Sequence, residues 1–167
     1  DKSNKQLVIG IGTDHMLWDD LLALRGLYKY DWRISRLAPV KMPDLMRLLN
    51  MRRKDGHAVR YLHFAVHADE TGLQFADGLA TPKWLADALA DVQICLIMGC
   101  SADRVTDYLQ IVPYVVAFRE DVPNDGAVIF TEVFWEAIAE GLDPEAAFDR
   151  AVDRSPVNLR EYVELHC

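Results

Sequence analysis

Paired cysteines, metal motifs and long apolar runs are all scarce in this sequence. The chain has 3 cysteines, at positions 95, 100 and 167, and their spacing does not suggest a disulfide framework. An odd count without paired spacing indicates a reducing compartment, so we expect a cytoplasmic protein. Neither Cys-x-x-Cys nor His-Glu-x-x-His occurs. The sequence therefore gives no motif for zinc, and we expect neither a metal nor a cofactor.

Positive charge is also in short supply. Lysine and arginine total 18 against 26 aspartates and glutamates, which gives a net charge of −8. Arg52-Arg53-Lys54 is the one tight cationic cluster in the sequence, and its place suits the end of a helix. Without a basic block, we expect no contact with nucleic acid. No apolar stretch reaches membrane-spanning length, and residues 1–5 do not open a signal peptide, so we expect no membrane partner either.

The length of 167 residues suits a single domain with a sizeable core, so we expect one domain over residues 1–167. The sequence begins with Asp1 instead of methionine. We therefore expect this domain to be excised from a larger, multi-domain protein.

Strand-like and helix-like segments alternate along the chain, which predicts an α/β fold with a parallel sheet. Apolar runs bounded by turn residues predict strands over 6–11, 32–37, 59–66, 92–98 and 114–118, with a sixth strand or a frayed end at 162–165. Helical spacing and capping residues predict helices over 16–30, 43–53, 82–90, 103–111, 127–140 and 144–153. A short piece at 73–75 fits one arm of a hairpin.

His67 and Cys100 each follow an apolar run that reads as a strand. If the two runs are neighbouring parallel strands, an imidazole and a thiol emerge side by side at the carboxyl edge of one sheet. A cysteine nucleophile needs such a base nearby. The alternatives are a solvent-facing histidine and a buried structural cysteine. His63 and Cys95, deeper in the same runs, suit the core.

Other chemistry-bearing residues fall in the loops that should line the same edge. Gly99 allows a sharp turn, so that the backbone N–H of Cys100 can face a developing oxyanion. Asp14 is either a helix cap or part of a substrate pocket. Glu120 and Asp121 follow the fifth strand and are either solvated loop residues or part of that pocket.

Two segments carry a resemblance to a known family. Leu62-His63-Phe64-Ala65-Val66-His67 resembles the strand and catalytic histidine of caspase-like cysteine peptidases. Leu96-Ile97-Met98-Gly99-Cys100-Ser101 resembles their nucleophile segment, most closely that of CHAT proteases and separase. The resemblance spans roughly residues 58–152. It implies a caspase-like three-layer sandwich, with a mostly parallel sheet of about six strands in the order 2-1-3-4-5-6 flanked by helices.

The resemblance also implies roles for the site residues. Cys100 would be the nucleophile and His67 the general acid and base, with an oxyanion site around Ala68, Gly99 and Ser101. Asp121 falls where relatives recognise a basic residue before the scissile bond. The remaining candidates for that pocket are Asp14 and Glu120.

The implied activity is that of a thiol protease, a hydrolase that cleaves a protein substrate after Arg or Lys in bacterial signalling or defence. A regulatory or sensor domain would be its partner.

Two alternatives remain open at this point. The first is an inactive caspase-like domain used for docking, because Ala68 stands where these peptidases usually carry glycine directly after the histidine. The second is a flavodoxin-like domain that binds a phosphate or nucleotide. Its support is Gly10-x-Gly12 after the first strand, although the third glycine of a dinucleotide fingerprint is missing.

Overall fold

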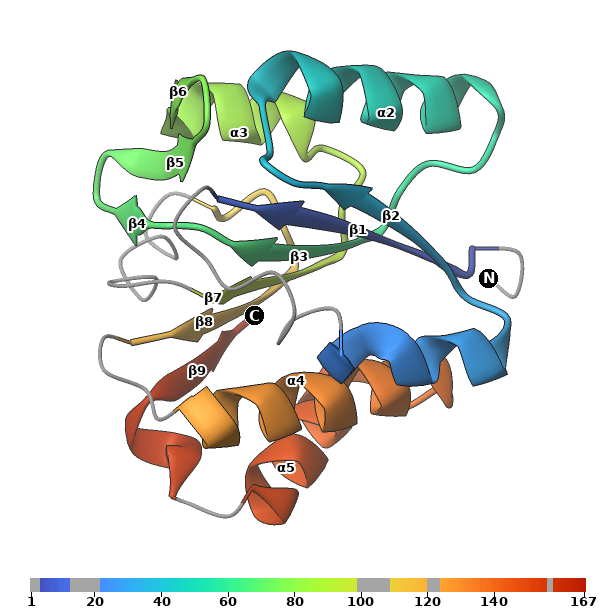
Figure 1. The fold of residues 1–167 in the computed structure, drawn as a ribbon, viewed down its shortest axis with the longest axis vertical. Coiled ribbons are helices and arrows are strands. Elements are labelled where there is room, and N and C mark those ends of the chain that lie inside the picture. Colours follow the sequence, from blue (N-terminus) through green and yellow to red (C-terminus); the bar gives the residue numbers. More distant parts are fainter. Residues whose placement is uncertain (1–3, 13–21, 99–108, 120–123, 156–157) are drawn as a thin grey trace.

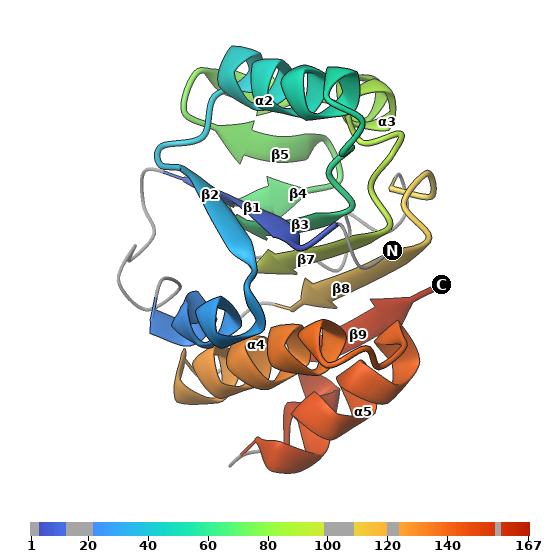
Figure 2. The ribbon, with the colours of Figure 1, turned by 90° about the vertical axis from the view of Figure 1, so that its right-hand side faces the viewer.

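A six-stranded sheet between two layers of helices forms the body of the protein in the computed structural model (Figure 1). The structure describes residues 4–12, 22–98, 109–119, 124–155 and 158–167. Helices α2 and α3 cover one face of the sheet, and α4 and α5 cover the other, as the turned view also shows (Figure 2). The predicted α/β class, with a mostly parallel sheet flanked by helices, is confirmed.

The strands of the large sheet run in the order β2-β1-β3-β7-β8-β9. All neighbours are parallel except β8 and β9, which are antiparallel. The expected order was 2-1-3-4-5-6. The observed order differs in its strand numbers, because three short strands, which belong to a second sheet, come between β3 and β7 in the chain. The bounds are β1 Gln6–Ile11, β2 Arg33–Leu37, β3 Tyr61–Ala65, β7 Ile94–Met98, β8 Tyr114–Phe118 and β9 Val163–His166.

The three intervening strands form a small antiparallel sheet of their own. They are β4 Ala68–Asp69, β5 Gly72–Phe75 and β6 Gly78–Ala80. The small sheet begins one residue after His67, so it lies at the carboxyl end of β3, beside α3 (Figure 1). The predicted hairpin arm at 73–75 is the middle strand of this sheet.

Helix starts follow the capping residues that the sequence supplies. Thr81 Oγ1 accepts a hydrogen bond from the Trp84 N–H at 3.3 Å, and Asp143 Oδ1 accepts one from the Ala146 N–H at 2.8 Å. A proline follows each cap, where its missing N–H costs nothing. The α-helices are α2 Met42–Lys54, α3 Pro82–Ala88, α4 Asn124–Ala139 and α5 Pro144–Arg154, and the 3-10 helices are η1 Arg25–Tyr30 and η3 Leu159–Glu161.

Two predicted helices differ from what the structure describes. Residues 25–30 of the expected helix 16–30 form the 3-10 helix η1, which ends where Asp31 takes a left-handed conformation (φ 63°). Residues 109–111 of the expected helix 103–111 are not helical. The other residues of that segment lie outside the described part of the chain.

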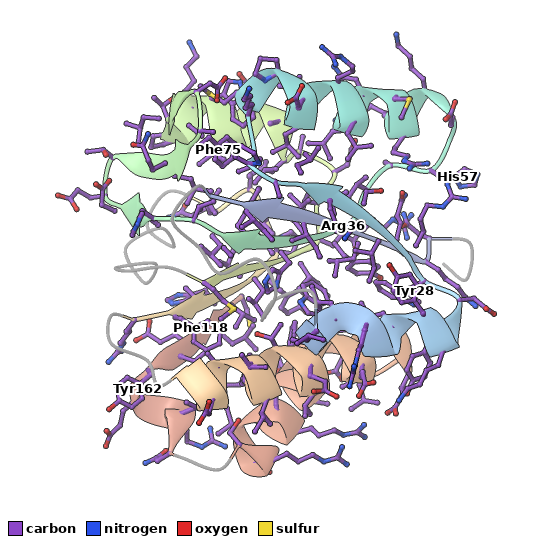
Figure 3. The ribbon with its side chains drawn as sticks, in the orientation of Figure 1. Tyr28, Arg36, His57, Phe75, Phe118 and Tyr162 are labelled. Carbon is purple, nitrogen blue, oxygen red and sulfur yellow. The ribbon has the colours of Figure 1, made fainter. Side chains whose placement is uncertain are left out.

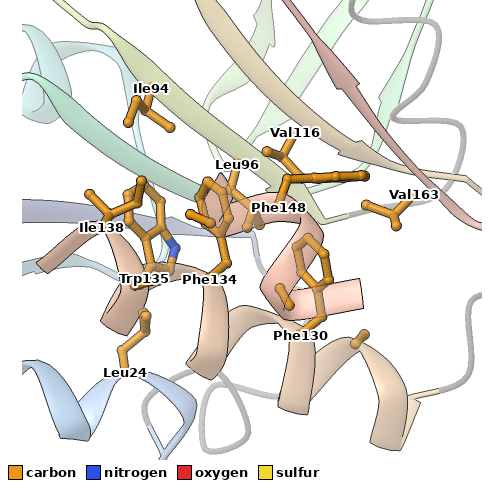
Figure 4. Close-up of a cluster of buried hydrophobic side chains, with 14 of the residues drawn as sticks. Leu24, Ile94, Leu96, Val116, Phe130, Phe134, Trp135, Ile138, Phe148 and Val163 are labelled. Carbon is orange, nitrogen blue, oxygen red and sulfur yellow. The ribbon is translucent and has the colours of Figure 1, made fainter. Parts of the chain in front are cut away.

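The core lies on both faces of the large sheet. One cluster packs α2, α3 and the small sheet against it, and the other packs α4, α5 and η1 against it. Aromatic rings dominate the second cluster: Phe130 stacks on Phe134 with centroids 5.9 Å apart, and Phe134 meets Trp135 edge to face at 5.2 Å (Figure 4). Among the described residues, no helix is both long enough and apolar enough to cross a membrane.

Candidate active site at the carboxyl edge of the sheet

Strands β3 and β7 end together at one edge of the sheet. Ala65, the last residue of β3, pairs with Met98, the last residue of β7. The hydrogen bonding continues one residue further, because the Val66 N–H donates to the Met98 carbonyl oxygen at 3.0 Å. On the other side of β3, the Gly12 N–H donates to the Ala65 carbonyl oxygen at 2.8 Å. The chain therefore leaves β1, β3 and β7 at one level.

His67 follows directly and presents an exposed side chain at this edge. Its backbone is held by both sheets. The preceding residue, Val66, is hydrogen-bonded to β7. The carbonyl oxygen of His67 accepts a hydrogen bond from the Gln74 N–H of β5 at 2.8 Å. Hydrogen bonds to both sheets therefore fix the backbone that carries the imidazole. Rigid elements hold a catalytic group more precisely than a loop does.

Ala68 is a strand residue with a buried side chain. It pairs with Leu73 across β4 and β5, and its methyl group belongs to the core cluster on the α2 and α3 side. Asp31 is the sole described non-glycine residue with a positive φ, so Ala68 has an ordinary backbone conformation for an L-residue. Nothing in the local backbone therefore requires glycine at this position.

The small sheet owes its tight geometry to Gly72. This glycine has φ +143°, and a Cβ added there would lie 2.1 Å from the Ala80 carbonyl oxygen of β6. The turn before it is closed by Asp69, whose Oδ1 accepts from the Thr71 N–H at 2.7 Å. Phe75, labelled in Figure 3 on the α3 side of the large sheet, packs against Phe64 of β3. The ring centroids are 5.6 Å apart. The small sheet is therefore anchored on the core rather than free at the surface.

His63 and Cys95 are core residues, as the sequence predicted. His63 is fully buried, and its Nδ1 accepts a hydrogen bond from the Trp135 Nε1–H of α4 at 3.2 Å. Cys95 pairs with Leu62 in the sheet and is also fully buried. Burial raises the pKa of the Cys95 thiol, because the thiolate would lose its hydration. Cys95 is thus an inert thiol and cannot serve as the nucleophile.

Six candidate residues from the sequence lie outside the described part of the chain. His67 and Ala68 are the two that the structure places. The elements that precede the others are placed as well: β1 ends at Ile11, β7 at Met98 and β8 at Phe118, all pointing to the same edge (Figure 1). The six residues outside the description are Asp14, Gly99, Cys100, Ser101, Glu120 and Asp121.

Gly10 has a packing role inside β1. A Cβ at this position would lie 2.8 Å from Cδ1 and 2.9 Å from Cε1 of the Phe64 ring on β3. Gly10 is a strand residue, paired with Leu37 and with Phe64, and so it is not part of a loop that could cradle a phosphate. The need to leave room for the Phe64 ring explains the glycine at this position. Gly10-x-Gly12 therefore no longer supports a phosphate-binding loop.

The described residues include no cluster of three or more histidine, cysteine or acidic side chains that could hold a metal ion. Sequence reasoning missed two features near the sheet edges. One is the hydrogen bond from the Gln74 N–H to the His67 carbonyl oxygen, a tertiary contact that the predicted hairpin arm at 73–75 did not reveal. The other is a cavity at the opposite, amino-terminal edge, whose lining comes from four separate segments.

Comparison of the chain with models of protein families and with curated proteins finds no match. Any functional argument therefore depends on the residues and on the arrangement of the two strand ends.

Proposed function

We propose that this chain is a caspase-like cysteine endopeptidase domain that uses His67 and Cys100 as its catalytic dyad. The observation that carries the proposal is the pairing of Ala65 with Met98. His67 follows the first of these by two residues, and Cys100 follows the second by two residues.

Chain connectivity limits how far the two groups can separate. Neighbouring strands lie about 4.8 Å apart, and two residues of extended chain span at most about 7 Å. Chain connectivity alone therefore keeps His67 and Cys100 near the same short stretch of the sheet edge. The carboxyl ends of parallel strands are also where open α/β folds bind their ligands.

The proposed chemistry begins with attack of the Cys100 thiolate on the carbonyl carbon of the scissile peptide bond. The carbonyl π electrons move to oxygen, where backbone N–H groups near Ala68 and Cys100 stabilise the charge. When the carbonyl re-forms, the C–N bond breaks and protonated His67 gives its proton to the departing amine. Water then loses a proton to His67 and attacks the thioester, and Cys100 leaves as the thiolate.

The substrate proposed for this site is a protein segment with Arg or Lys before the scissile bond. Asp121, together with Asp14 and Glu120, would supply carboxylates for that side chain, because charge-assisted hydrogen bonds of this kind are strong. The net charge of −8 favours the approach of a basic segment. An extended peptide would lie along this edge of the sheet, held partly by strand addition.

Ala68 gives no specific support to the alternative that this is an inactive domain used for docking. Ala68 is 7% exposed as a residue and belongs to the core cluster, and its backbone conformation suits alanine. Alanine also keeps the backbone N–H that an oxyanion site would use. The departure from glycine therefore gives no physical reason to expect a dead enzyme.

The proposal is tested with a set of fluorogenic peptides that carry Arg, Lys, Asp or Leu before the cleavable bond. We expect the wild type to cleave the Arg and Lys peptides, and Cys100→Ala and His67→Ala to lower kcat/KM at least about a thousandfold. Cys167→Ser is the matched control, because this exposed cysteine lies at the far end of the sequence. Equal rates for Cys100→Ala and the wild type would refute the proposal.

A further inference from the structure

A cationic cavity lies at the amino-terminal edge of the sheet, opposite the candidate active site. It has a volume of about 290 Å³. Its walls come from the starts of β1 and β2, from the last turn of α2 and from the loop after α2. Figure 3 shows His57 on this side of the molecule, and Figure 1 shows the amino ends of β1 and β2 there as well. The lining residues are Lys5, Gln6, Asp31, Arg33, Arg52 and His57.

Hydrogen bonds join the four walls into one frame. The Arg33 N–H donates to the Lys5 carbonyl oxygen at 2.7 Å, which ties β2 to β1. Gln6 Nε2 donates to the His57 carbonyl oxygen at 2.6 Å, which ties β1 to the loop. The His57 N–H in turn donates to the Arg52 carbonyl oxygen at 3.0 Å. A frame held in this way is already organised for a ligand, which lowers the entropic cost of binding.

The charge in this cavity is unusual for an acidic protein. Three permanent cations and one histidine converge, whereas Asp31 is the single acidic residue among the described residues that line the cavity. Within the described part of the chain, none of Lys5, Arg33 and Arg52 forms an ion pair with an acidic side chain. The contrast is Arg53, the next residue along, whose Nε pairs with Asp91 Oδ2 at 2.5 Å. Uncompensated cations around a concave surface attract an anion.

Arg52 supplies the second, independent observation. Its Nε is fully buried and donates to no acceptor among the described residues. Buried donors are normally satisfied, because a desolvated N–H without an acceptor is costly. The carbonyl oxygens of residues 51–53 near the end of α2 accept hydrogen bonds from the N–H groups of Asp55, Gly56 and His57. Arg52 Nε thus has no acceptor among the described residues, and the charge of this guanidinium adds to that of Lys5 and Arg33 in the lining.

We propose that this cavity is a binding site for a small phosphate-bearing ligand, held by Arg52, Arg33 and Lys5. Guanidinium groups match the geometry of phosphate oxygens, and lysine adds a point charge. Asp31 favours phosphate over other oxyanions. Its carboxylate can accept a hydrogen bond from the P–O–H of monohydrogen phosphate, whereas sulfate carries no such proton at neutral pH. The site is separate from the proposed dyad and does not depend on it.

The experiment is isothermal titration calorimetry of the whole chain with sodium phosphate, in a buffer of constant ionic strength. We expect saturable binding, weakened about tenfold or more by Arg52→Gln and by Arg33→Gln. Arg36→Gln is the matched control, because Arg36 is an exposed arginine of the same strand that does not line the cavity (Figure 3). Its phosphate affinity should equal that of the wild type. If Arg52→Gln folds poorly, the exposed Arg33 still provides the test.

Sodium sulfate is titrated in parallel. Sulfate should bind at least about tenfold more weakly than phosphate, and Asp31→Asn should narrow that gap. Absence of any saturable phosphate heat would overturn the site. Equal weakening by Arg52→Gln and Arg36→Gln would show that only net charge matters and would also overturn it. Equal affinity for sulfate would overturn the assignment to a phosphate ligand.

Discussion

The N–H of Val66 donates to the carbonyl oxygen of Met98 at 3.0 Å, one residue beyond the last paired position of β3 and β7. This bond fixes the level at which both chains leave the sheet. His67 is the next residue on one side, and the Gly99-Cys100 segment is next on the other. The proposed dyad depends on this relationship more than on any other contact in the protein.

Cys95 should resist alkylation in the folded protein. It is fully buried, and burial raises its pKa, so at pH 8 it is neither accessible nor ionised. We expect iodoacetamide to label Cys100 first and Cys95 only in urea, as read by peptide mass spectrometry. Labelling of Cys95 at the rate of Cys100 under native conditions would contradict this description.

The same thiol should make stability fall at alkaline pH. The unfolded state releases the Cys95 proton near the ordinary pKa of 9.0, whereas the folded state keeps it, because the folded pKa is raised. The free energy of unfolding is therefore unaffected by this group below pH 9 and falls as the pH rises above it. Urea denaturation at pH 8 to 10.5 should show a steeper decline for the wild type than for Cys95→Ala. Parallel curves would mean that the thiol is not buried as described.

Gly10→Ala should destabilise the protein by about 1–3 kcal/mol, because the added methyl group would lie 2.8 Å from the Phe64 ring. Gly12→Ala is the matched control, since the nearest atom to a Cβ there is 3.5 Å away. Urea denaturation measures both. If instead Gly10→Ala left stability intact and removed phosphate binding, the phosphate-loop alternative would be restored.

Ala68→Gly tests the docking alternative. Loss of a buried methyl group and the greater chain entropy of glycine in a strand should together cost about 1–2 kcal/mol of stability. Because the backbone of Ala68 is already in an ordinary conformation, we expect no gain in peptide cleavage over the wild type. An inert wild type that becomes active as Ala68→Gly would show that alanine had disabled the site.

Asp121→Asn tests the proposed preference for basic residues. Removing the carboxylate charge should reduce kcat/KM for Arg and Lys peptides by about tenfold or more, with little effect on a Leu peptide. Asp87→Asn serves as the control for lost negative charge, because Asp87 is an exposed residue in the last turn of α3, which precedes the amino end of β7. An unchanged ratio of Arg to Leu cleavage would remove Asp121 from the pocket.

The large sheet was predictable because its strands carry clear signals. Tyr114–Phe118 is an uninterrupted apolar run that is buried by helices, and its predicted bounds agree with β8. Because such strands are joined by right-handed helical crossovers, the sequence also led to β3 and β7 as neighbours. The edge pairing beneath the proposed dyad could thus be inferred before any coordinates were known.

The sequence predicted only one arm of the small sheet, at 73–75, and it gave no sign of the cationic cavity. Strand β4 has two residues, and β6 has three, too few for a period to be seen. Their pairing depends on tertiary contacts, such as the close approach of Gly72 to Ala80. Lys5, Arg33 and Arg52 are far apart in the sequence and converge only because β1, β2 and the end of α2 meet at one edge. Such convergence leaves no local pattern.

The most direct test of the dyad is covalent capture by a peptidyl chloromethyl ketone with lysine beside the reactive carbon. We expect one adduct per chain, mapped by mass spectrometry to Cys100, and a much slower reaction in His67→Ala. The exposed thiol of Cys167 serves as the internal reference, since it shares the solution but not the site. Reaction at Cys167 alone, or equal rates at both cysteines, would contradict the assignment of His67 and Cys100 as a catalytic pair.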